Sequence, residues 1–369
     1  MICSTESYPR ANQHIDSLPL YVPGRAISSV AREHGFDEGR IVKLASNENP
    51  LGFSVRVQKV LMKLAMNPSS CYPDADATEL KLRLSDCYSV DAAWITIGSG
   101  SSEILEMAAR AYAGPGDTVV MSQYAFASYY LAAAGVGATP VVVPAPDYRH
   151  DLDAMLKAIR PNTKLVYIAN PNNPTGSFLD KTEIQRFLDA VPQHIVVVLD
   201  EAYAEYLASS QQSSPGELAG RYPNLIVART FSKIYGLAAF RIGYSIAQPH
   251  LSCALNKVRP PFNTSSYAQA AAAAAILDQD FVAQSRRMNE DGRRQFYAAF
   301  DDRALACLPS AGNFVLVNVG DGVRVSQRLM EKAIIVRPVA NYGLREWLRV
   351  SVGTADQNSR FLSALPEVL

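Results

Sequence analysis

From about residue 72 onward, short apolar runs alternate with amphipathic stretches. This alternation predicts repeated strand–helix–strand units, and hence a mainly parallel sheet with helices on both faces. The seven predicted strands are 94–97, 118–122, 138–143, 164–169, 194–199, 225–229 and 241–247, and the helices between them are 78–88, 101–113, 126–135, 151–159 and 180–190. We therefore expect an α/β fold built on a seven-stranded sheet.

The segments on either side of this repeat follow a different pattern. After about residue 258 we expect helices at 266–278 and 280–300, strands near 313–319, 334–337 and 347–352, and a closing helix near 355–366. Helical periodicity also occurs at 26–34 and 54–66, whereas the first 25 residues are polar and interrupted by prolines. The sequence thus predicts an arm (1–25), part of a small domain (26–70), a large α/β domain (71–258) and a small α+β domain (259–369).

Charge and composition narrow the class of partner. The chain has 35 basic (Lys, Arg) and 35 acidic (Asp, Glu) residues, so no net charge attracts a nucleic acid or an anionic membrane and a small molecule is the expected partner. The longest apolar run, 268–277, is too short to span a bilayer. The five scattered cysteines lack metal-ligand spacing and the N-terminus lacks a secretory pattern, so we expect a cytoplasmic protein with reduced thiols and no metal site.

Lys233 is the first candidate for chemistry. It follows the strand predicted at 225–229 and stands close to Thr230 and Ser232. A lysine just beyond a buried strand loses solvation, so its pKa falls and the amine becomes nucleophilic enough to form a Schiff base with an aldehyde such as pyridoxal phosphate. That cofactor also needs a carboxylate at its pyridine nitrogen, donors at its ring oxygen, an apolar or aromatic face and an anion site for its phosphate.

The phosphate requirement directs attention to the loop that follows the first predicted strand. In a parallel sheet ligands bind beyond the carboxyl ends of the strands, and there the chain reads GSGSSE over 98–103 before a helix begins. Glycines let the backbone approach an anion, and the helix N-terminus offers unpaired N–H groups. A dinucleotide-binding loop would carry glycine in place of Glu103, so a single phosphate fits the loop better than NAD.

Other strand ends supply candidates for the remaining requirements. Asp200 follows an apolar strand, where a buried carboxylate needs a cation such as a protonated pyridine. Asn172 and Asn173 offer an amide to a ring oxygen, Phe126 can stack on a ring, and the guanidinium of Arg241, at the start of a predicted strand, suits a phosphate. An apolar strand ending in Asp-Glu also occurs in P-loop ATPases, but the chain contains no G-x-x-x-x-G-K-[ST] motif.

Several short sequence blocks, which include the loops described above, resemble the fold-type I pyridoxal-phosphate aminotransferases. Within these enzymes, the blocks resemble the histidinol-phosphate aminotransferase family. The similar blocks are LPLYVPGR (18–25), KLASNENPLG (43–52), CYPD (71–74), GSGSSE (98–103), YAFASY (124–129), NPNNPTG (170–176), DEAY (200–203), TFSKIYGLAAFRIGY (230–244), VRP (336–338) and LRVSVGT (348–354). They extend over nearly the whole chain.

The resemblance implies a role for each candidate. Lys233 would carry the cofactor as a Schiff base, Asp200 would pair with the pyridine N–H, and Asn173 and Tyr203 would hydrogen-bond the ring hydroxyl. Phe126 would stack on the ring. Of these residues, Lys233, Asp200 and Tyr203 would be catalytic.

The resemblance also implies which residues hold the charged groups. The cofactor phosphate would be bound by Gly100, Ser101, Ser102, Thr230, Ser232 and Arg241, with Tyr72 arriving from the other subunit of a homodimer that shares its active sites. The substrate would contact Arg349, Arg337, Asn47 and, again from the other subunit, Tyr21. Ser102 departs from the family, whose members commonly carry aspartate there, so only the backbone contact carries over.

The implied reaction is transamination between histidinol phosphate and imidazole-acetol phosphate, with glutamate and 2-oxoglutarate as the second pair, in histidine biosynthesis. An aromatic amino acid aminotransferase would share every cofactor residue, and a decarboxylase of O-phospho amino acids would resemble the same family. The aminotransferase-like domain of transcription regulators follows a helix-turn-helix domain, for which the 70 residues before the sheet leave no room.

Overall fold

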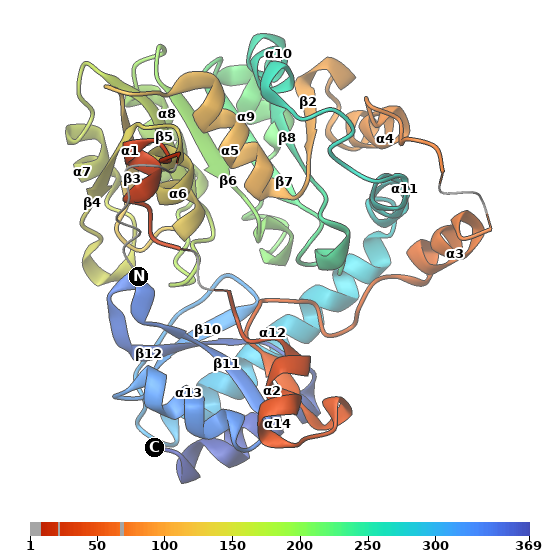
Figure 1. Cartoon of the computed structure of the whole chain (residues 1–369), viewed down its shortest axis with the longest axis vertical. Coiled ribbons are helices and arrows are strands. Elements are labelled where there is room, and N and C mark those ends of the chain that lie inside the picture. The colour runs from red at the N-terminus through yellow and green to blue at the C-terminus, as the bar shows by residue number, and fades with distance from the viewer. Residues whose placement is uncertain (1–8, 21–22, 67–69) are drawn as a thin grey trace.

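The computed structural model describes residues 9–20, 23–66 and 70–369. In this part of the chain, two sheets organise the fold, one of seven strands and one of five. Figure 1 shows the larger sheet with its helices in the upper half and the smaller sheet, close to the C-terminus, in the lower half. The predicted α/β fold with a mainly parallel seven-stranded sheet and a smaller α+β part is confirmed.

The seven-stranded sheet is parallel except for one strand. Its order is β2 (Ile95–Gly98), β8 (Gly243–Ala247), β7 (Leu225–Thr230), β6 (Val196–Asp200), β5 (Thr163–Ala169), β3 (Thr118–Ser122) and β4 (Thr139–Val143). Only β8 runs antiparallel to its neighbours β2 and β7. The carboxyl ends of β5, β6 and β7 therefore meet at one edge, where ligands bind in sheets of this kind.

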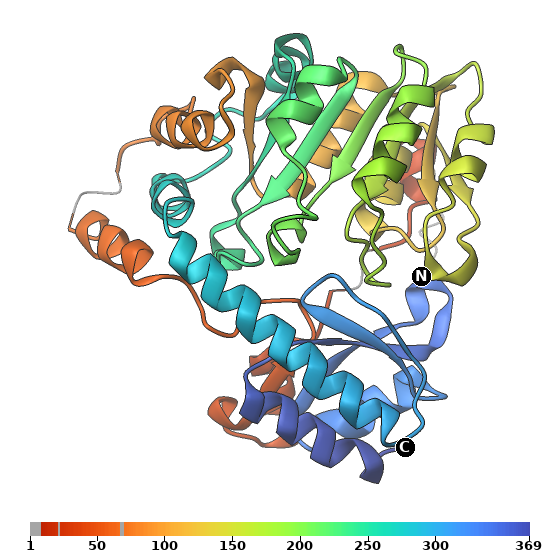
Figure 2. The ribbon, with the colours of Figure 1, turned by 180° about the vertical axis from the view of Figure 1, so that it is seen from behind.

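Both faces of this sheet are covered by helices. Side chains alternate between the faces of a strand, and in β6 Val196 and Val198 join one apolar cluster while Val197 and Leu199 join another. Helices α5, α6 and α10 pack on the first face, and α7, α8 and α9 on the second (Figures 1 and 2). Their bounds are α5 (Ser101–Tyr112), α6 (Ala127–Gly135), α7 (Leu152–Lys157), α8 (Lys181–Ala190), α9 (Pro215–Arg221) and α10 (Pro249–Val258).

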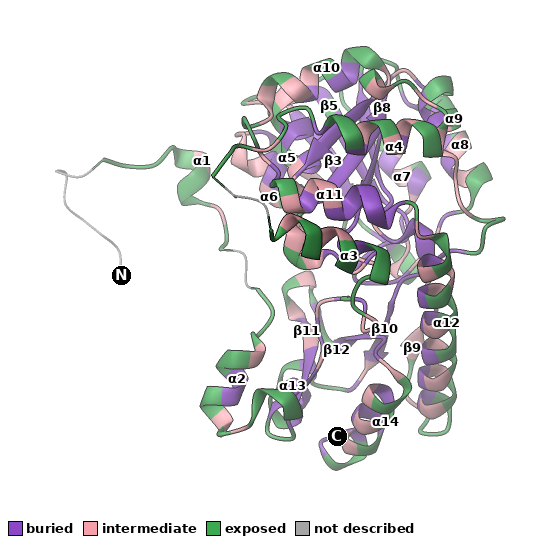
Figure 3. Ribbon diagram, turned by 90° about the vertical axis from the view of Figure 1, so that its right-hand side faces the viewer, coloured by how far each residue is buried: buried purple, intermediate pink, exposed green. Residues whose placement is uncertain are grey.

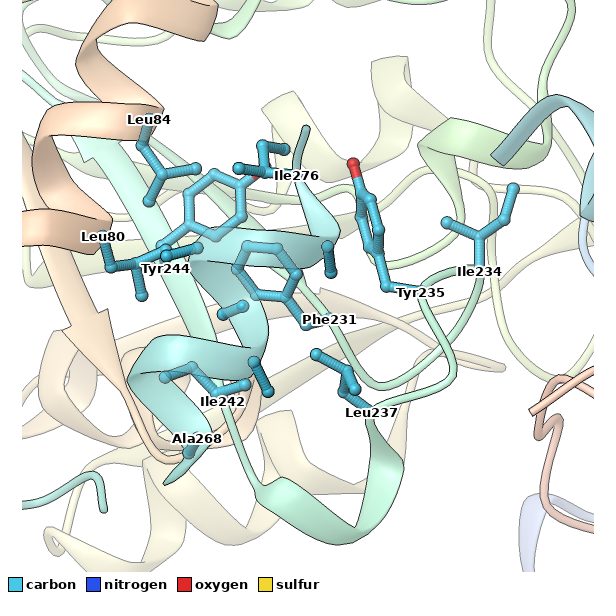
Figure 4. Close-up of a cluster of buried hydrophobic side chains, with 14 of the residues drawn as sticks. Leu80, Leu84, Phe231, Ile234, Tyr235, Leu237, Ile242, Tyr244, Ala268 and Ile276 are labelled. Carbon is cyan, nitrogen blue, oxygen red and sulfur yellow. The ribbon is translucent and has the colours of Figure 1, made fainter. Parts of the chain in front are cut away.

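A third apolar cluster closes the β2 end of the sheet. Leu80 and Leu84 of α4 (Thr78–Tyr88) and Ala268 of α11 (Ser266–Ala275) surround Tyr244 of β8, as Figure 4 shows. Helix α3 (Val55–Leu64) packs against α11. These contacts place α3 and α11 beside the seven-stranded sheet.

The second sheet has helices on both faces. Its order is β1 (Val42–Leu44), β11 (Ile334–Val339), β12 (Leu344–Ser351), β10 (Phe314–Asn318) and β9 (Cys307–Leu308), and only the β1–β11 pair is parallel. Helices α12 (Gln279–Asp301), α13 (Gly322–Met330) and α14 (Ala355–Ala364) bury Phe296, Phe300 and Phe361 against one face. Helix α2 (Ile27–His34) packs against Ile335 of β11 on the other face.

Helix α12 (Gln279–Asp301) connects the two parts. Its 23 residues correspond to a length of about 35 Å, and Figure 2 shows it running from the upper half into the lower half. Val282 near its start belongs to the cluster at the large sheet, whereas Phe296 belongs to the core of the small one. One rigid element thus contributes to both cores.

The structure departs from the sequence-based expectations at a few elements. The last strand of the large sheet begins at Gly243 instead of 241, and helices α9, α10 and α13 were not expected. In the N-terminal arm, α1 (Gln13–Asp16) lies beside α6 and buries none of its residues. Among the described residues, no helix combines the length and apolarity that crossing a bilayer requires. The four-part division at residues 25, 70 and 258 stays a prediction.

Candidate active site

A cavity of about 250 Å³ lies at the carboxyl ends of β5, β6 and β7. It is lined by Ser101, Ser102, Phe126, Tyr129, Ala169, Pro171, Asn173, Asp200, Ala202, Tyr203, Thr230, Ser232, Lys233 and Arg241. Most of the predicted cofactor-binding residues therefore line one space. A larger cavity of about 670 Å³, beside Arg149 and Arg293, is lined by none of them. The candidate site is therefore identified by the residues that line it and not by its volume.

The loop after β7 fixes Lys233. Phe231, Ile234 and Leu237 are fully buried, and Figure 4 shows their side chains in the apolar cluster around Tyr244. Lys233 instead faces the cavity, where its Nζ donates a hydrogen bond to the carbonyl of Ser46 at 3.1 Å. Burial, and then the positive charge of Arg349, lower the pKa of Lys233 from 10.5 to about 7. The amine is thus poised to exchange protons near neutral pH.

Asp200 is the last residue of β6 and is 5% exposed. Its Oδ2 accepts a hydrogen bond from the Tyr129 hydroxyl at 2.8 Å, and its Oδ1 accepts one from the Ala202 N–H at 3.2 Å. Burial raises the pKa of Asp200 to about 6, and these two hydrogen bonds oppose the rise because they favour the carboxylate. The site therefore holds a buried carboxylate that a protonated ring nitrogen would stabilise.

Tyr129 was not identified from the sequence. It is fully buried on α6, and its ring stacks on that of Tyr167 with centroids 4.7 Å apart and planes at 7°. One signal for it existed: Tyr129 lies three residues after Phe126, so in a helix that starts there both side chains share a face. Tyr129 therefore holds the carboxylate of Asp200 from the same helix that presents Phe126 to the cavity.

The two predicted donors to the ring oxygen, Asn173 and Tyr203, are each hydrogen-bonded to a residue of the small sheet or of the segment that follows β1. Asn173 Oδ1 accepts a hydrogen bond from Arg349 Nη1 at 2.6 Å, which leaves the amide nitrogen of Asn173 as the donor for a ligand. The Tyr203 hydroxyl accepts one from Asn47 Nδ2 at 2.9 Å, and burial raises the pKa of Tyr203 to about 12. Both therefore remain neutral hydrogen-bond donors at physiological pH.

The neighbouring asparagines of the same loop have structural partners. Asn170 exchanges two hydrogen bonds with the backbone of Leu179, and Asn172 Nδ2 donates to the Tyr124 carbonyl and to Thr175 Oγ1. Of the adjacent pair 172 and 173, only Asn173 lines the cavity.

An anion cradle forms where α5 begins. Ser101 and Ser102 start the helix, and Gly100 before them has φ of +81°. A Cβ at Gly100 would lie 2.6 Å from Arg241 Nη2, so the guanidinium passes directly over this glycine. Arg241 Nη1 also donates to Ser232 Oγ at 3.2 Å. A helix N-terminus, an arginine and hydroxyl groups converge there, as binding of a phosphate requires.

The backbone of Arg241 corrects one expectation. Arg241 does not start a strand: it lies two residues before β8 with φ of +51°, in the left-handed region. This conformation is unfavourable for a residue with a side chain. It occurs at the position that directs the guanidinium over Gly100.

Phe126 lies at the cavity as expected. It immediately precedes α6, and its ring is perpendicular to that of Tyr129 at a centroid distance of 6.0 Å. It also lines a second cavity of about 350 Å³, together with Leu20 and Tyr342. The ring therefore stands between the two cavities.

Six predicted residues are not among those that line the cavity: Gly100, Asn47, Arg349, Tyr72, Arg337 and Tyr21. Gly100 lies under the guanidinium of Arg241, and Asn47 and Arg349 hydrogen-bond to Tyr203 and Asn173. Tyr72 is 80% exposed and stacks on Phe262 at 4.5 Å. Arg337 is half-buried on β11, in register with Arg349 on β12. Tyr21 lies outside the described residues.

A buried ionic cluster behind the cavity was also missed. Arg229 pairs with Glu201 at 2.7 Å and lies 3.7 Å from Glu205, and all three side chains are at most 7% exposed. Arg229 is on β7 and Glu201 follows β6, so the pair joins the strand ends that carry Thr230 and Asp200. Burial raises the pKa of Glu205 to about 6, and Arg229 opposes this rise.

The residues present fit pyridoxal phosphate. One cavity brings together a buried amine, a buried carboxylate, two neutral donors, an aromatic face and an anion cradle, which together meet the requirements of that cofactor. In the described part of the chain, no group of three or more His, Cys, Asp or Glu side chains is arranged to hold a metal ion.

Comparisons with known proteins agree with this chemistry. A family model described as "Aminotransferase class I and II" matches residues 39–365. The chain is 51% identical over 361 residues to histidinol-phosphate aminotransferase 2 of Ralstonia nicotianae, covering 97% of this chain and 96% of that protein. It is 49% identical over 365 residues to histidinol-phosphate aminotransferase 1 of Cupriavidus pinatubonensis, covering 98% and 97%.

Solved structures show the same similarity. The crystal structure of histidinol-phosphate aminotransferase from Sinorhizobium meliloti, in complex with pyridoxal 5′-phosphate, aligns with a TM-score of 0.89 at 34% identity and covers 98% of both chains. An aspartate aminotransferase of Thermus thermophilus aligns with a TM-score of 0.84 at 21% identity, covering 98% of this chain and 100% of that chain. The second match shows the fold alone.

Proposed function

We propose that this chain, which belongs to the aminotransferase class I and II family, uses pyridoxal phosphate to interconvert histidinol phosphate and imidazole-acetol phosphate. Glutamate and 2-oxoglutarate form the second pair, and the reaction belongs to histidine biosynthesis. The observation that carries this proposal is the meeting of Lys233, Asp200 and the anion cradle in one cavity. The names of the relatives from Ralstonia and Sinorhizobium support the choice of substrate.

Each residue of the cavity has a task in this reaction. When bound through Lys233, the cofactor supplies a ring that withdraws the charge developing at the α-carbon of the substrate. Asp200 would keep the proton on the pyridine nitrogen, and Asn173 and Tyr203 would donate hydrogen bonds to the ring oxygen. Lys233 would take the proton from the α-carbon of the substrate as general base and deliver it to the cofactor as general acid; a pKa of about 7 suits both roles.

The paired arginines support an anionic substrate. Arg337 and Arg349 are direct cross-strand neighbours on β11 and β12, so their side chains lie on the same face of the sheet. Like charges opposite one another are unfavourable, and an anion between them would relieve the repulsion. A dianionic phosphate, or the carboxylates of glutamate, suits this pair better than a neutral aromatic ring does.

A substrate comparison tests this proposal. Turnover of histidinol phosphate, phenylalanine, tyrosine and aspartate should be measured with 2-oxoglutarate as acceptor. We expect the highest kcat/KM with histidinol phosphate, and Arg337→Ala should raise KM for that substrate at least about tenfold while sparing phenylalanine. A preference for phenylalanine with equal losses in the variant would favour an aromatic aminotransferase, and release of CO2 without 2-oxoglutarate would favour a decarboxylase.

We also propose a cytoplasmic homodimer with shared active sites. An exposed apolar surface supports it, consisting of Val55 (64% exposed), Met62 (66%) and Met66 (86%) on and just after α3, together with Tyr72 (80%). Figure 3 shows the exposed side of α3 facing the viewer. An isologous dimer would cover this surface in both copies and bring each Tyr72 toward the other copy's cofactor phosphate. The described cysteines are all free thiols, consistent with the cytoplasm.

Mixed dimers test the sharing of sites. Lys233→Ala and Tyr72→Ala should each be impaired alone. In a mixed dimer, the site with an intact Lys233 receives its tyrosine from the Lys233→Ala chain, so one complete site is rebuilt. Activity of the refolded mixture should exceed the sum of its parents. Strict additivity, with hybrids demonstrated, would place Tyr72 in no shared site.

A further inference from the structure

The segment between β1 and α3 reaches from the small sheet to two residues that line the cavity, Lys233 and Tyr203. The Ser46 carbonyl accepts the hydrogen bond of Lys233, and the next side chain, Asn47, donates to the hydroxyl of Tyr203 at 2.9 Å. Asn47 is 1% exposed and has φ of +54°, a left-handed conformation that asparagine tolerates better than most residues. A buried amide in this backbone conformation is unexpected for a simple linker between elements.

The hydrogen bonds of Asn47 fix the orientation of its amide. The Ser351 hydroxyl accepts the backbone N–H of Asn47 at 2.8 Å and donates its own proton to Asn47 Oδ1 at 2.9 Å. Asn313 Nδ2 holds the carbonyl of Asn47 at 3.0 Å. With Oδ1 bound by Ser351, the Nδ2 group is the one that faces Tyr203. The orientation thus follows from the network of partners.

This orientation decides the direction in which Tyr203 donates. A tyrosine hydroxyl has one proton, and an oxygen that accepts from Asn47 Nδ2 must direct that proton elsewhere. Tyr203 lines the cavity, and burial raises its pKa to about 12, so the proton stays on the hydroxyl at physiological pH. A cofactor in the cavity would therefore meet a donor whose orientation is already set.

We propose that Asn47 is a positioning residue: it turns the Tyr203 hydroxyl so that its proton is donated to the ring oxygen of bound pyridoxal phosphate. The inference rests on the proposed function and assigns Asn47 a role through Tyr203 in place of the predicted contact with substrate. It also links the cofactor to the small sheet, because Ser351, which orients Asn47, is the last residue of β12.

The effect is measurable in the visible spectrum of the holoenzyme. A donor to the ring oxygen stabilises negative charge there, and that charge otherwise retains the proton on the nitrogen that joins Lys233 to the cofactor. When the donor is lost, this nitrogen holds its proton to higher pH. The absorbance of the linked cofactor depends on that proton, so a pH titration gives a midpoint for each variant.

Two substitutions at Asn47 introduce residues that can adopt its left-handed backbone conformation. Asn47→Gly removes the amide and retains a residue that adopts positive φ, and Asn47→Asp keeps the shape but replaces the donor with an acceptor that competes for the Tyr203 proton. We expect the midpoint to rise by about half to one pH unit in Asn47→Gly. Tyr203→Phe should raise it at least as much. If Asn47→Gly does not fold, Asn47→Asp replaces it in the same comparison.

The double variant tests whether Asn47 acts through Tyr203. In the Tyr203→Phe background, Asn47→Gly should cause no further change, since the hydroxyl that it orients is gone. An unchanged midpoint in the single Asn47 variant, or an equal rise with and without the Tyr203 hydroxyl, would overturn the inference while leaving the enzyme's function intact. Absence of any cofactor absorbance in the wild type would instead contradict the proposed function.

Discussion

Replacing Asp200 with asparagine should stabilise the cofactor-free protein and at the same time abolish its activity. Burial raises the pKa of Asp200 from 3.8 to about 6. A carboxyl group with a raised folded-state pKa binds its proton more readily in the folded state, so its contribution to stability is fully present below about pH 4 and is lost as the pH rises through about 6. At neutral pH the wild-type protein therefore carries a buried carboxylate that weakens the fold.

The magnitude follows from the two pKa values. They differ by about 2, and each pKa unit corresponds to about 1.4 kcal/mol, so the cost near pH 8 is about 3 kcal/mol. Asparagine avoids this cost and can keep both contacts: its Oδ1 accepts the Ala202 N–H, and its Nδ2 donates to the Tyr129 oxygen. With an m-value of about 3 kcal/mol/M, the gain equals about 1 M in the urea midpoint.

Urea unfolding of cofactor-free protein between about pH 4 and pH 8, at fixed chain concentration, measures this effect. The advantage of Asp200→Asn should grow from below about 1 kcal/mol near pH 4 to about 3 kcal/mol near pH 8. Asp86→Asn, the same chemical change at an exposed position of α4, serves as control and should stay within about 0.5 kcal/mol of the wild type. An Asp200→Asn variant that is no more stable at pH 8, or equally more stable at every pH, would refute the reasoning.

Two further substitutions test contacts that hold Asp200 and the loop after Lys233 in place. Tyr129→Phe removes only the hydroxyl that donates to Asp200 and keeps the stacked ring; a hydrogen bond to a charged group is worth about 1.5–3 kcal/mol, so kcat should fall about tenfold to a hundredfold, and an unchanged kcat would contradict this role. Gly236→Ala should lower stability by at least about 2 kcal/mol, because Gly236 has φ of +71° and a Cβ there would lie 1.8 Å from the Gly52 carbonyl oxygen. Gly220→Ala, where nothing lies within 4 Å of the added Cβ, is the matched control, and equal urea midpoints for the two variants would disprove the explanation.

The sequence predicted the parts of the site that depend on local pattern. All seven strands of the large sheet were expected within a few residues of their observed positions, because buried parallel strands are continuous apolar runs. A polar residue directly after such a run lies at the carboxyl end of a strand, and therefore at the ligand-binding edge of the sheet. This placement depends only on the local sequence. Asp200, Asn173 and Lys233 were therefore found from their positions relative to the strands.

The residues that were missed depend on contacts between distant segments. Tyr129 is 71 positions from Asp200, so no spacing rule connects the two. Asn47 was predicted to contact the substrate, but its hydrogen bond to Tyr203, 156 positions away, was not predicted. The cluster of Arg229, Glu201 and Glu205 was missed for the same reason. Only the packing of the elements brings these groups together.

Helices α9, α10 and α13 were also not predicted. Helix α9 has only seven residues, of which Gly216 and Gly220 disfavour a helix, and its stability comes from packing beside β7 and β8. Helix α10 begins with Pro249, and its buried Leu251 and Leu255 stand at helical spacing, so the pattern was present and was overlooked. Arg241 was predicted to start a strand because nothing in the sequence indicates that an arginine adopts a left-handed backbone conformation.

The central claim is that Lys233 binds the cofactor, and chemical reduction of the holoenzyme tests it most directly. Borohydride converts the bond between a lysine and pyridoxal phosphate into a stable amine, and peptide mass spectrometry then identifies the modified residue. Lys233→Ala, which lacks the amine, is the control and should take up no label in its place. We expect a pyridoxyl group on Lys233 of the yellow wild-type protein. A label on another lysine, or no label on a protein that turns over substrate, would contradict the account.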